Sequence, residues 1–119
     1  MPKIAVKAKR LSIYIGESDN YERQSLYKSI VSKMKELDMA GVTVFRGIMG
    51  YGEDKRIHTA NLLDLSSDLP ILVEIIDSEE YIAKLLPYLD QVLEKGLVTI
   101  DDVEVLKYGK EAIVAKGVE

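Results

Sequence analysis

The chain has 119 residues, of which 47% are hydrophobic and 30% charged, with no cysteine and a single histidine. This length suits one domain with one hydrophobic core, and the balance excludes disordered, collagenous and low-complexity proteins. The lack of cysteine excludes disulfides, thiolate chemistry and cysteine-ligated zinc, and one histidine leaves little for an imidazole metal site. A net charge of −4 provides no general attraction for nucleic acid, so no nucleic-acid partner is predicted. Because no apolar run has the length of a membrane span or a signal peptide, we expect a cytoplasmic protein.

The first part of the sequence predicts a strand, a helix and a second strand. Residues 10–16 alternate apolar and polar side chains at the period of a half-buried strand. A helix is predicted to start near Tyr21 and to end at Gly41, because apolar residues recur there at the i, i+4 and i+8 spacing. Residues 42–48 begin with Val-Thr-Val-Phe, a β-branched and aromatic run that predicts the second strand.

A long segment without regular patterning follows the second predicted strand. Residues 49–68 contain two glycines and a run of charged side chains, and they predict a loop. A loop of this length is uncommon in a small domain and is usually functional or mobile. We therefore describe residues 1–119 as a single domain, with 1–9 and 110–119 as tails and 49–68 as a functional loop.

The second half of the sequence predicts another strand, helix and strand. Residues 69–76 are almost continuously apolar. Asp77 and Glu80 have the spacing of a capping box, and they predict a helix that closes at Gly96. Residues 97–107 predict a fourth strand that two consecutive aspartates interrupt.

The predicted element order is βαββαβ. It indicates an α+β, ferredoxin-like fold, with a four-stranded antiparallel sheet and two helices on one face. The other face is then uncovered, and alternation along the strands places Tyr14, Leu72 and Ile76 there. Apolar surface left bare in this way usually marks an interface, so a homo-oligomer is predicted.

Three stretches resemble the PII superfamily of nitrogen-regulatory proteins. They are residues 40–52, with a Gly-Val-Thr-Val strand and a Gly-x-Gly turn, the His-Thr pair at 58–59, and residues 68–76, with Leu-Pro before a glutamate-bearing strand. Over residues 9–109 the chain is similar to an uncharacterised family of PII-like proteins. The resemblance implies a homotrimer with inward-facing sheets, adenine nucleotides in the clefts between subunits, and an exposed T-loop at 49–68.

The resemblance also implies where the nucleotide would bind. The corresponding positions are Thr43, the turn Gly50-Tyr51-Gly52, the strand backbone from Glu74 to Ile76, and Lys107. The chain departs from PII proteins, because the loop before its fourth strand lacks their second phosphate-cradling glycine and their paired arginines are reduced to Lys107. This smaller supply of positive charge favours AMP or ADP over ATP as the ligand.

The same residues also have structural interpretations. A Gly-x-Gly turn exposes N–H groups to an anion, but it can equally end a strand and open a loop. Lys55, Arg56 and His58 can engage phosphate, Arg56 best because of its planar fork, although an exposed loop of mixed charge is often only solvated. Glu74 lies in an apolar strand and needs a cationic partner, for which Arg46 or a neighbouring subunit's lysine is predicted.

The sequence therefore favours a non-enzymatic regulatory trimer. It would bind AMP or ADP and dock a regulated protein or a membrane transporter through residues 49–68. No nucleophile elbow, catalytic base or metal cluster is evident that would indicate an enzyme. The alternative is a structural or metal-related trimer that resembles the CutA copper-tolerance proteins and binds no nucleotide, although the lack of cysteine and the single histidine count against it.

Overall fold

The structure is a computed structural model that describes residues 7–60 and 68–110. Six elements form the body of the molecule. They are β1 (Lys7–Gly16), α1 (Leu26–Glu36), β4 (Val42–Arg46), β7 (Pro70–Asp77), α2 (Glu79–Val92) and β8 (Leu97–Glu104). Two short hairpins are added to this body. One pairs β2 (Asn20–Tyr21) with β3 (Gln24–Ser25), and the other pairs β5 (Met49–Gly50) with β6 (His58–Thr59).

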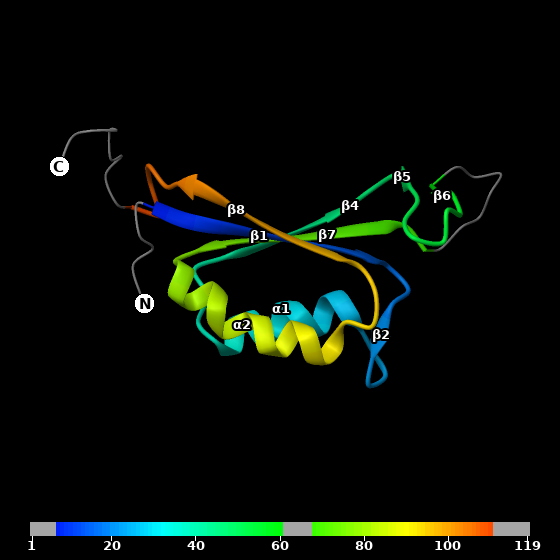
Figure 1. Cartoon of the computed structure of the whole chain (residues 1–119), viewed down its shortest axis with the longest axis horizontal. Helices are drawn as coiled ribbons and strands as arrows, with labels where there is room; N and C mark the ends of the chain where they lie inside the picture. The colour runs from blue at the N-terminus through cyan, green and yellow to red at the C-terminus, as the bar shows by residue number, and fades with distance from the viewer. Residues whose placement is uncertain (1–6, 61–67, 111–119) are drawn as a thin grey trace.

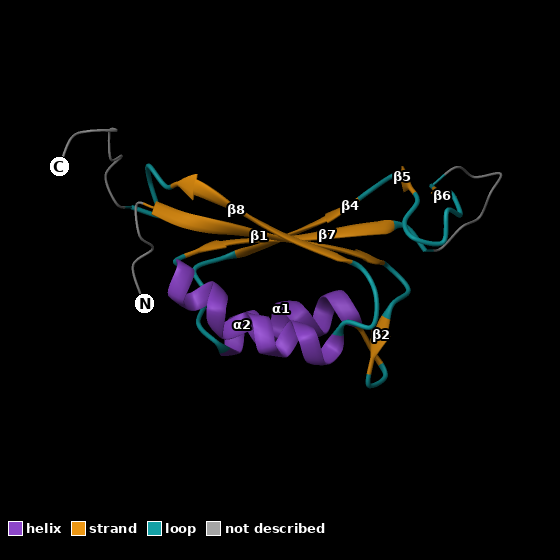
Figure 2. Ribbon diagram, in the orientation of Figure 1, coloured by secondary structure: helices purple, strands orange, loops and turns teal. Residues whose placement is uncertain are grey.

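The main sheet has the strand order β4-β7-β1-β8, and every neighbouring pair is antiparallel. Both helices lie on one side of it, as Figures 1 and 2 show. This arrangement confirms the predicted α+β, ferredoxin-like fold.

The hydrophobic core lies between the two central strands and the helices. Alternate side chains of β1 and β7 point toward the helices, because successive residues of a strand face opposite sides. The buried strand residues are Leu11, Ile13, Ile15, Ile71, Val73 and Ile75. The helices contribute Leu26, Ile30, Met34, Ile82, Leu85, Leu89 and Val92.

Helix α1 is shorter than predicted at both ends. It begins at Leu26 rather than near Tyr21, because the preceding residues turn back on themselves as the β2–β3 hairpin. It stops before Gly41, because Asp38 adopts φ 59° and the Met39 N–H donates to the Met34 carbonyl at 3.0 Å. That bond closes the helix in a Schellman-type turn, with aspartate in the position that glycine usually takes.

The predicted interruption of the fourth strand is wrong. Strand β8 is continuous, because both of its aspartates have cationic partners directly across on β1. The Arg10 Nη2 atom lies 2.6 Å from Asp101 Oδ2, and Lys9 Nζ contacts Asp102 Oδ1. These ion pairs raise the pKa of Arg10 and lower that of Asp101.

Helix α2 begins one residue later than the predicted capping box implies. Its N-cap is Ser78, whose side-chain oxygen accepts from the Tyr81 N–H at 3.2 Å. Asp77 is buried and accepts from the Ala40 N–H at 2.7 Å, so it fixes the connection that leads into β4. The helix ends at Val92, and Gly96 serves the turn into β8 instead.

Several predicted boundaries shift by a few residues. Strand β1 begins at Lys7, and β4 ends at Arg46 rather than continuing to residue 48. The segment 49–68 is not entirely loop, because it contains the β5–β6 hairpin. Residues 61–67 of that segment, and the greater part of both predicted tails, lie outside the described residues.

Candidate functional site

The β5–β6 hairpin carries most of the side chains that the sequence singled out for phosphate. Met49 pairs with Thr59 and Gly50 with His58. The hairpin follows edge strand β4 and projects from one end of the sheet (Figure 1). Residues 51–57 between its strands are all exposed. The structure thereby brings together Gly50, Tyr51, Gly52, Arg56 and His58.

The glycines of the hairpin have different surroundings. A Cβ atom on Gly50 would lie 3.2 Å from Pro70 Cγ, and one on the nearby Gly47 only 2.8 Å from the same atom. These two glycines therefore let the hairpin pack closely against the start of β7. Gly52 has open space around its Cα atom, so packing does not explain it. Of the Gly-x-Gly pair, Gly52 is the one available for backbone approach by a ligand.

The turn of the hairpin is held by its own hydrogen bonds. The Lys55 N–H donates to the Gly52 carbonyl at 2.9 Å, and the Arg56 N–H donates to Asp54 Oδ1 at the same distance. The Lys55 ammonium lies 5.8 Å from the centroid of the Tyr51 ring. The turn thus presents the exposed Arg56 side chain next to an aromatic ring and an ammonium group.

His58 links the hairpin to the start of β7 electrostatically. Its Nε2 atom is 3.9 Å from Asp54 Oδ2. Burial raises the pKa of Asp68, but hydrogen bonds from Ser18 and the positive charges of His58 and Lys95 outweigh burial, so this pKa is lowered overall. An ionised Asp68 therefore favours a positive charge at the base of the hairpin.

Three further predicted residues lie together on the uncovered face of the sheet. Thr43 on β4 is directly opposite Glu74 on β7, and Ser12 on β1 is opposite Glu74 on its other side. Ile76 lies two residues further along β7 on the same face, next to Arg10. These residues form a patch that is separate from the hairpin.

The predicted ion pair between Glu74 and Arg46 does not form. Strand alternation puts Arg46, which is paired with Ile71, on the opposite face of the sheet from Glu74. The Arg46 Nε atom instead lies 3.0 Å from Glu17 Oε2. The charge of Glu74 acts on Arg10, where it helps to raise the guanidinium pKa after the larger effect of Asp101.

Lys107 lies far from the hairpin within one chain. It is exposed and follows the end of β8. The neighbouring Tyr108 hydroxyl donates to the Ala40 carbonyl, just before β4 begins, whereas the hairpin comes after β4 ends. Figure 1 shows the end of β8 and the β5–β6 hairpin at opposite ends of the sheet. One chain alone does not bring Lys107 and the hairpin to the same ligand.

The described parts of the chain offer little for a metal or a membrane. Within residues 7–60 and 68–110, no three histidine, aspartate or glutamate side chains converge as metal ligands would. Neither helix in these ranges is long and apolar enough to cross a bilayer.

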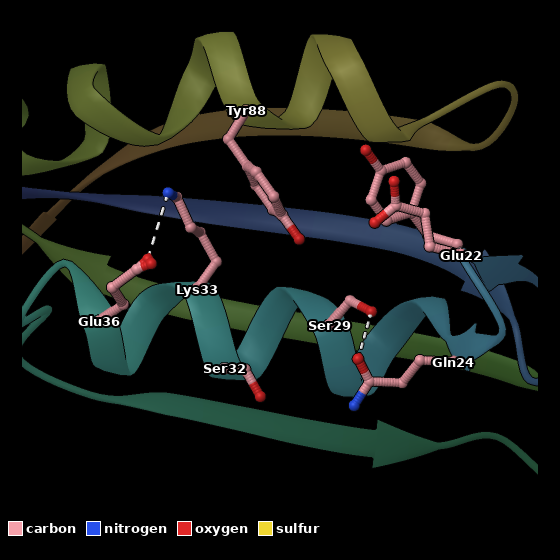
Figure 3. A pocket seen from close by; sticks show the side chains of 8 residues that line it. Glu22, Gln24, Ser29, Ser32, Lys33, Glu36 and Tyr88 are labelled. Atoms are coloured by element: carbon pink, nitrogen blue, oxygen red, sulfur yellow. Dashed lines mark hydrogen bonds and ion pairs between the residues drawn. The ribbon is translucent and has the colours of Figure 1, made fainter.

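Sequence analysis missed a groove on the helical side of the molecule, which we call the helix groove. It has a volume of about 270 Å³ and lies between the β2–β3 hairpin, α1 and α2 (Figure 3). Its lining side chains are mostly polar. They are Tyr21, Glu22, Gln24, Ser29, Ser32, Lys33, Glu36 and Tyr88.

The turn beside the helix groove explains why the sequence did not reveal it. Glu22 and Arg23 adopt φ 48° and φ 69°. A two-residue hairpin loop needs such positive values, but Asn-Gly or Asp-Gly normally supplies them. A Glu-Arg pair carries no local turn signal, so these residues were assigned to the start of a helix.

Solved structures show which class of fold this is. The nitrogen regulatory PII-like protein CPII from Thiomonas intermedia K12, solved bound to ADP, AMP and bicarbonate, has a TM-score of 0.60 at 18% identity over 83% of this chain and 88% of its own. A PII-like signaling protein from Thermus thermophilus has a TM-score of 0.60 at 25% identity, covering 84% and 90%. The fold is therefore that of the PII-like proteins.

Sequence comparison identifies the family within that class. The model of the DUF190 family, described as Uncharacterized ACR, COG1993, matches residues 8–105. A UPF0166 protein of Aquifex aeolicus is 43% identical over 103 residues, which are 85% of this chain and 95% of the relative. A UPF0166 protein of Methanocaldococcus jannaschii is 39% identical, covering 86% and 94%. The chain belongs to the DUF190/UPF0166 family.

Proposed function

We propose that this protein is a trimeric, non-enzymatic regulatory module that binds AMP or ADP between subunits. Its PII-like fold supports the proposal, as does the similar fold of CPII, which was solved bound to ADP and AMP. The observation that carries the proposal is an apolar row across the uncovered face of the sheet.

This apolar row occupies one register level on all four strands. Phe45 on β4 is opposite Leu72 on β7, Leu72 is opposite Tyr14 on β1, and Tyr14 is opposite Leu97 on β8. Phe45, Tyr14 and Leu97 are 47%, 45% and 57% exposed. Side chains of this size and continuity are expected to be covered by another protein surface, and a second and third copy of the sheet would cover them.

A polar row lies beside the apolar row on the same face. Thr43, Glu74, Ser12 and Thr99 are opposite one another across the four strands. Polar groups that enter an interface need hydrogen-bond partners. The predicted positions Thr43 and Glu74 therefore fall where subunits would meet, and hydroxyl and carboxylate groups there can recognise a nucleoside.

An intersubunit site also resolves the separation of the predicted phosphate ligands. Lys107 and the β5–β6 hairpin lie at opposite ends of one sheet (Figure 1). A ligand that contacts Lys107 of one subunit and the hairpin of another requires an assembly. Because few cations are available, each added phosphate would gain few donors, so AMP or ADP is preferred over ATP.

The hairpin itself is suited to contact a further partner. Large apolar side chains are exposed on and around it. They are Ile48, Met49, Tyr51 and Ile57. We propose that this surface docks a regulated protein or a membrane transporter when the nucleotide state changes. Exposed apolar groups at a projecting hairpin are typical of interaction surfaces.

Calorimetry tests nucleotide binding directly. AMP has roughly 23 non-hydrogen atoms, and about −0.3 kcal/mol per atom gives a dissociation constant on the order of 10 μM. Lys107→Ala is expected to weaken binding by about 1–3 kcal/mol, the scale for one charge-assisted hydrogen bond. Lys28→Ala, which removes an exposed lysine from α1, is the matched control and is expected to bind like the wild type. Tighter binding of ATP with magnesium, or no nucleotide binding, would contradict the proposal.

A further inference from the structure

The helix groove lies on the side of the molecule away from the uncovered sheet face. Its lining residues come from α1, α2 and the β2–β3 hairpin, and Figure 3 shows it open on the side opposite the strands. An assembly formed through the sheet faces leaves this side accessible. Binding in the helix groove is therefore independent of the nucleotide site proposed above.

One end of the helix groove already holds an ammonium group of the chain. The Lys33 Nζ atom lies 5.5 Å from the centroid of the Tyr88 ring and 3.4 Å from Glu36 Oε1. An aromatic face together with a carboxylate is the combination that recognises alkylammonium ions. This half of the groove thus shows, with an internal group, the chemistry that the groove offers.

The other end of the groove presents a carboxylate without such an ammonium. Figure 3 shows Tyr88 descending between Lys33 and Glu22. Within residues 7–60 and 68–110, no lysine or arginine forms an ion pair with Glu22. The Tyr21 hydroxyl next to it accepts from Gln91 Nε2 at 3.0 Å, which fixes the position of that ring.

The electrostatic environment of the groove is negative. Its lining contains two carboxylates and one ammonium group. Burial raises the pKa of Tyr88, and Tyr21, Glu36 and Glu22 raise it further. Ser29 donates its hydroxyl hydrogen to Gln24 Oε1 at 3.0 Å, so its oxygen is left to accept from a ligand.

The β2–β3 turn holds Glu22 at this end in an unfavourable backbone conformation. Two successive non-glycine residues with positive φ are costly, and such strain persists only where the surrounding structure imposes it. Asparagine would satisfy the same turn with less strain. The glutamate at this position is therefore not explained by turn formation.

We propose that the helix groove binds a small primary alkylammonium ion, with Glu22 as its carboxylate partner and the Tyr88 ring beside it. A volume of about 270 Å³ corresponds to about nine water molecules of about 30 Å³ each, which suits a short amine. The ammonium group would donate to Glu22 and to the Ser29 oxygen, and its alkyl chain would lie along the tyrosine rings.

Titration of the full-length protein with n-butylamine tests the proposal. Butan-1-ol, the uncharged match, and butyrate, the anionic match, are titrated in parallel, and amide chemical shifts locate the contact. We expect saturable binding of butylamine alone, with shifts at residues 21–24, 29–36 and 88. Binding of butyrate in place of butylamine, or no saturable binding of butylamine, would overturn the proposal.

Two substitutions in the turn separate binding from folding. Glu22→Asn removes the carboxylate while favouring the turn, so the variant is expected to be at least as heat-stable as the wild type. Its affinity for butylamine should fall about tenfold, the scale for one charge-assisted contact. Arg23→Asn makes the same change at the adjacent turn position but keeps Glu22, and it should bind like the wild type. Equal affinity of both variants would overturn the assignment of Glu22.

Lys33→Met distinguishes a cation site from an anion site. The substitution removes the internal ammonium, so the Tyr88 ring and Glu36 become available to the ligand. We therefore expect tighter binding of butylamine. Loss of binding in this variant would mean that Lys33 anchors the ligand, and the proposal would be wrong. Because the probe carries no nucleotide, failure of nucleotide binding would leave this result unaffected.

Discussion

The two faces of the central sheet differ in a way that their composition does not reveal. On one face, Ile13 and Val73 are fully buried under the helices. On the other, Tyr14 and Leu97 are about half exposed, although Tyr14 follows Ile13 directly along the chain. Both faces carry large apolar side chains, but only one has a covering layer within the chain. The comparison teaches that the covered face explains the stability of one subunit, whereas the bare face has to be explained by a partner.

The largest effect on folding is expected from the covered face. Leu85 on α2 is fully buried, and Leu85→Ala would leave a cavity among close-packed side chains. The free energy of unfolding should fall by about 2–5 kcal/mol, as measured by urea denaturation. Leu97→Ala on the bare face is the matched control, and it should change the unfolding of an isolated subunit far less. Equal losses from both variants in the isolated subunit would contradict the difference between the faces.

A polar residue of the covered face should have a smaller effect. Asp77 is buried and accepts hydrogen bonds from the Ala40 and Ser78 N–H groups, both at 2.7 Å. Asp77→Ala would leave these donors without their acceptor and should destabilise the fold by about 1–3 kcal/mol. Glu74→Ala on the bare face serves as the control and is expected to lie within about 0.5 kcal/mol of the wild type. Thermal and urea unfolding measure both variants.

The pH dependence of stability gives a finer test at the base of the hairpin. The pKa of Asp68 is lowered in the folded state, chiefly because its hydrogen bonds with Ser18 and nearby positive charges outweigh its burial. Its stabilising contribution is therefore present above the ordinary value of 3.8 and is lost as the pH falls through the lower, folded-state pKa. Between about pH 5 and pH 3 the wild type should lose more stability than Asp68→Asn. Parallel curves for the two proteins would contradict this role of Asp68.

The smallest perturbation is a single cut by trypsin. Lys55 and Arg56 lie in an exposed turn outside the sheet and its helical layer. Limited proteolysis should therefore cleave after one of them before it cleaves at Lys33 or Lys35, which lie within α1. Earlier cleavage within α1 would mean that the helical layer, and not the hairpin, opens first.

The fold was predictable where local patterning and tertiary structure agree. Alternation along residues 10–16 and 69–76 predicted β1 and β7, because one face of each strand is buried and the other is not. The prediction was wrong where a distant partner overrides the local pattern. Asp101 interrupts no strand, since Arg10 pairs with it from β1, ninety-one residues away along the chain. Asp77 likewise caps the connection at Ala40 instead of α2.

The candidate site was predictable in its residue types but not in its arrangement. The glycines, Arg56 and His58 do share one hairpin, yet Gly50 is explained by its close packing against Pro70. Nothing local in the sequence indicates that Lys107 lies at the other end of the sheet. The helix groove carried no signal at all, because a Glu-Arg pair is not a usual hairpin turn.

The mass of the protein in solution tests the central claim most directly. Light scattering at micromolar concentration should give three times the 13.4 kDa of one chain. Tyr14→Asp should reduce this to the mass of one chain with the fold intact, because it places a carboxylate in the middle of the apolar row. Tyr14→Phe should leave the trimer unchanged. A wild-type monomer, or a trimer that Tyr14→Asp does not disturb, would contradict the account.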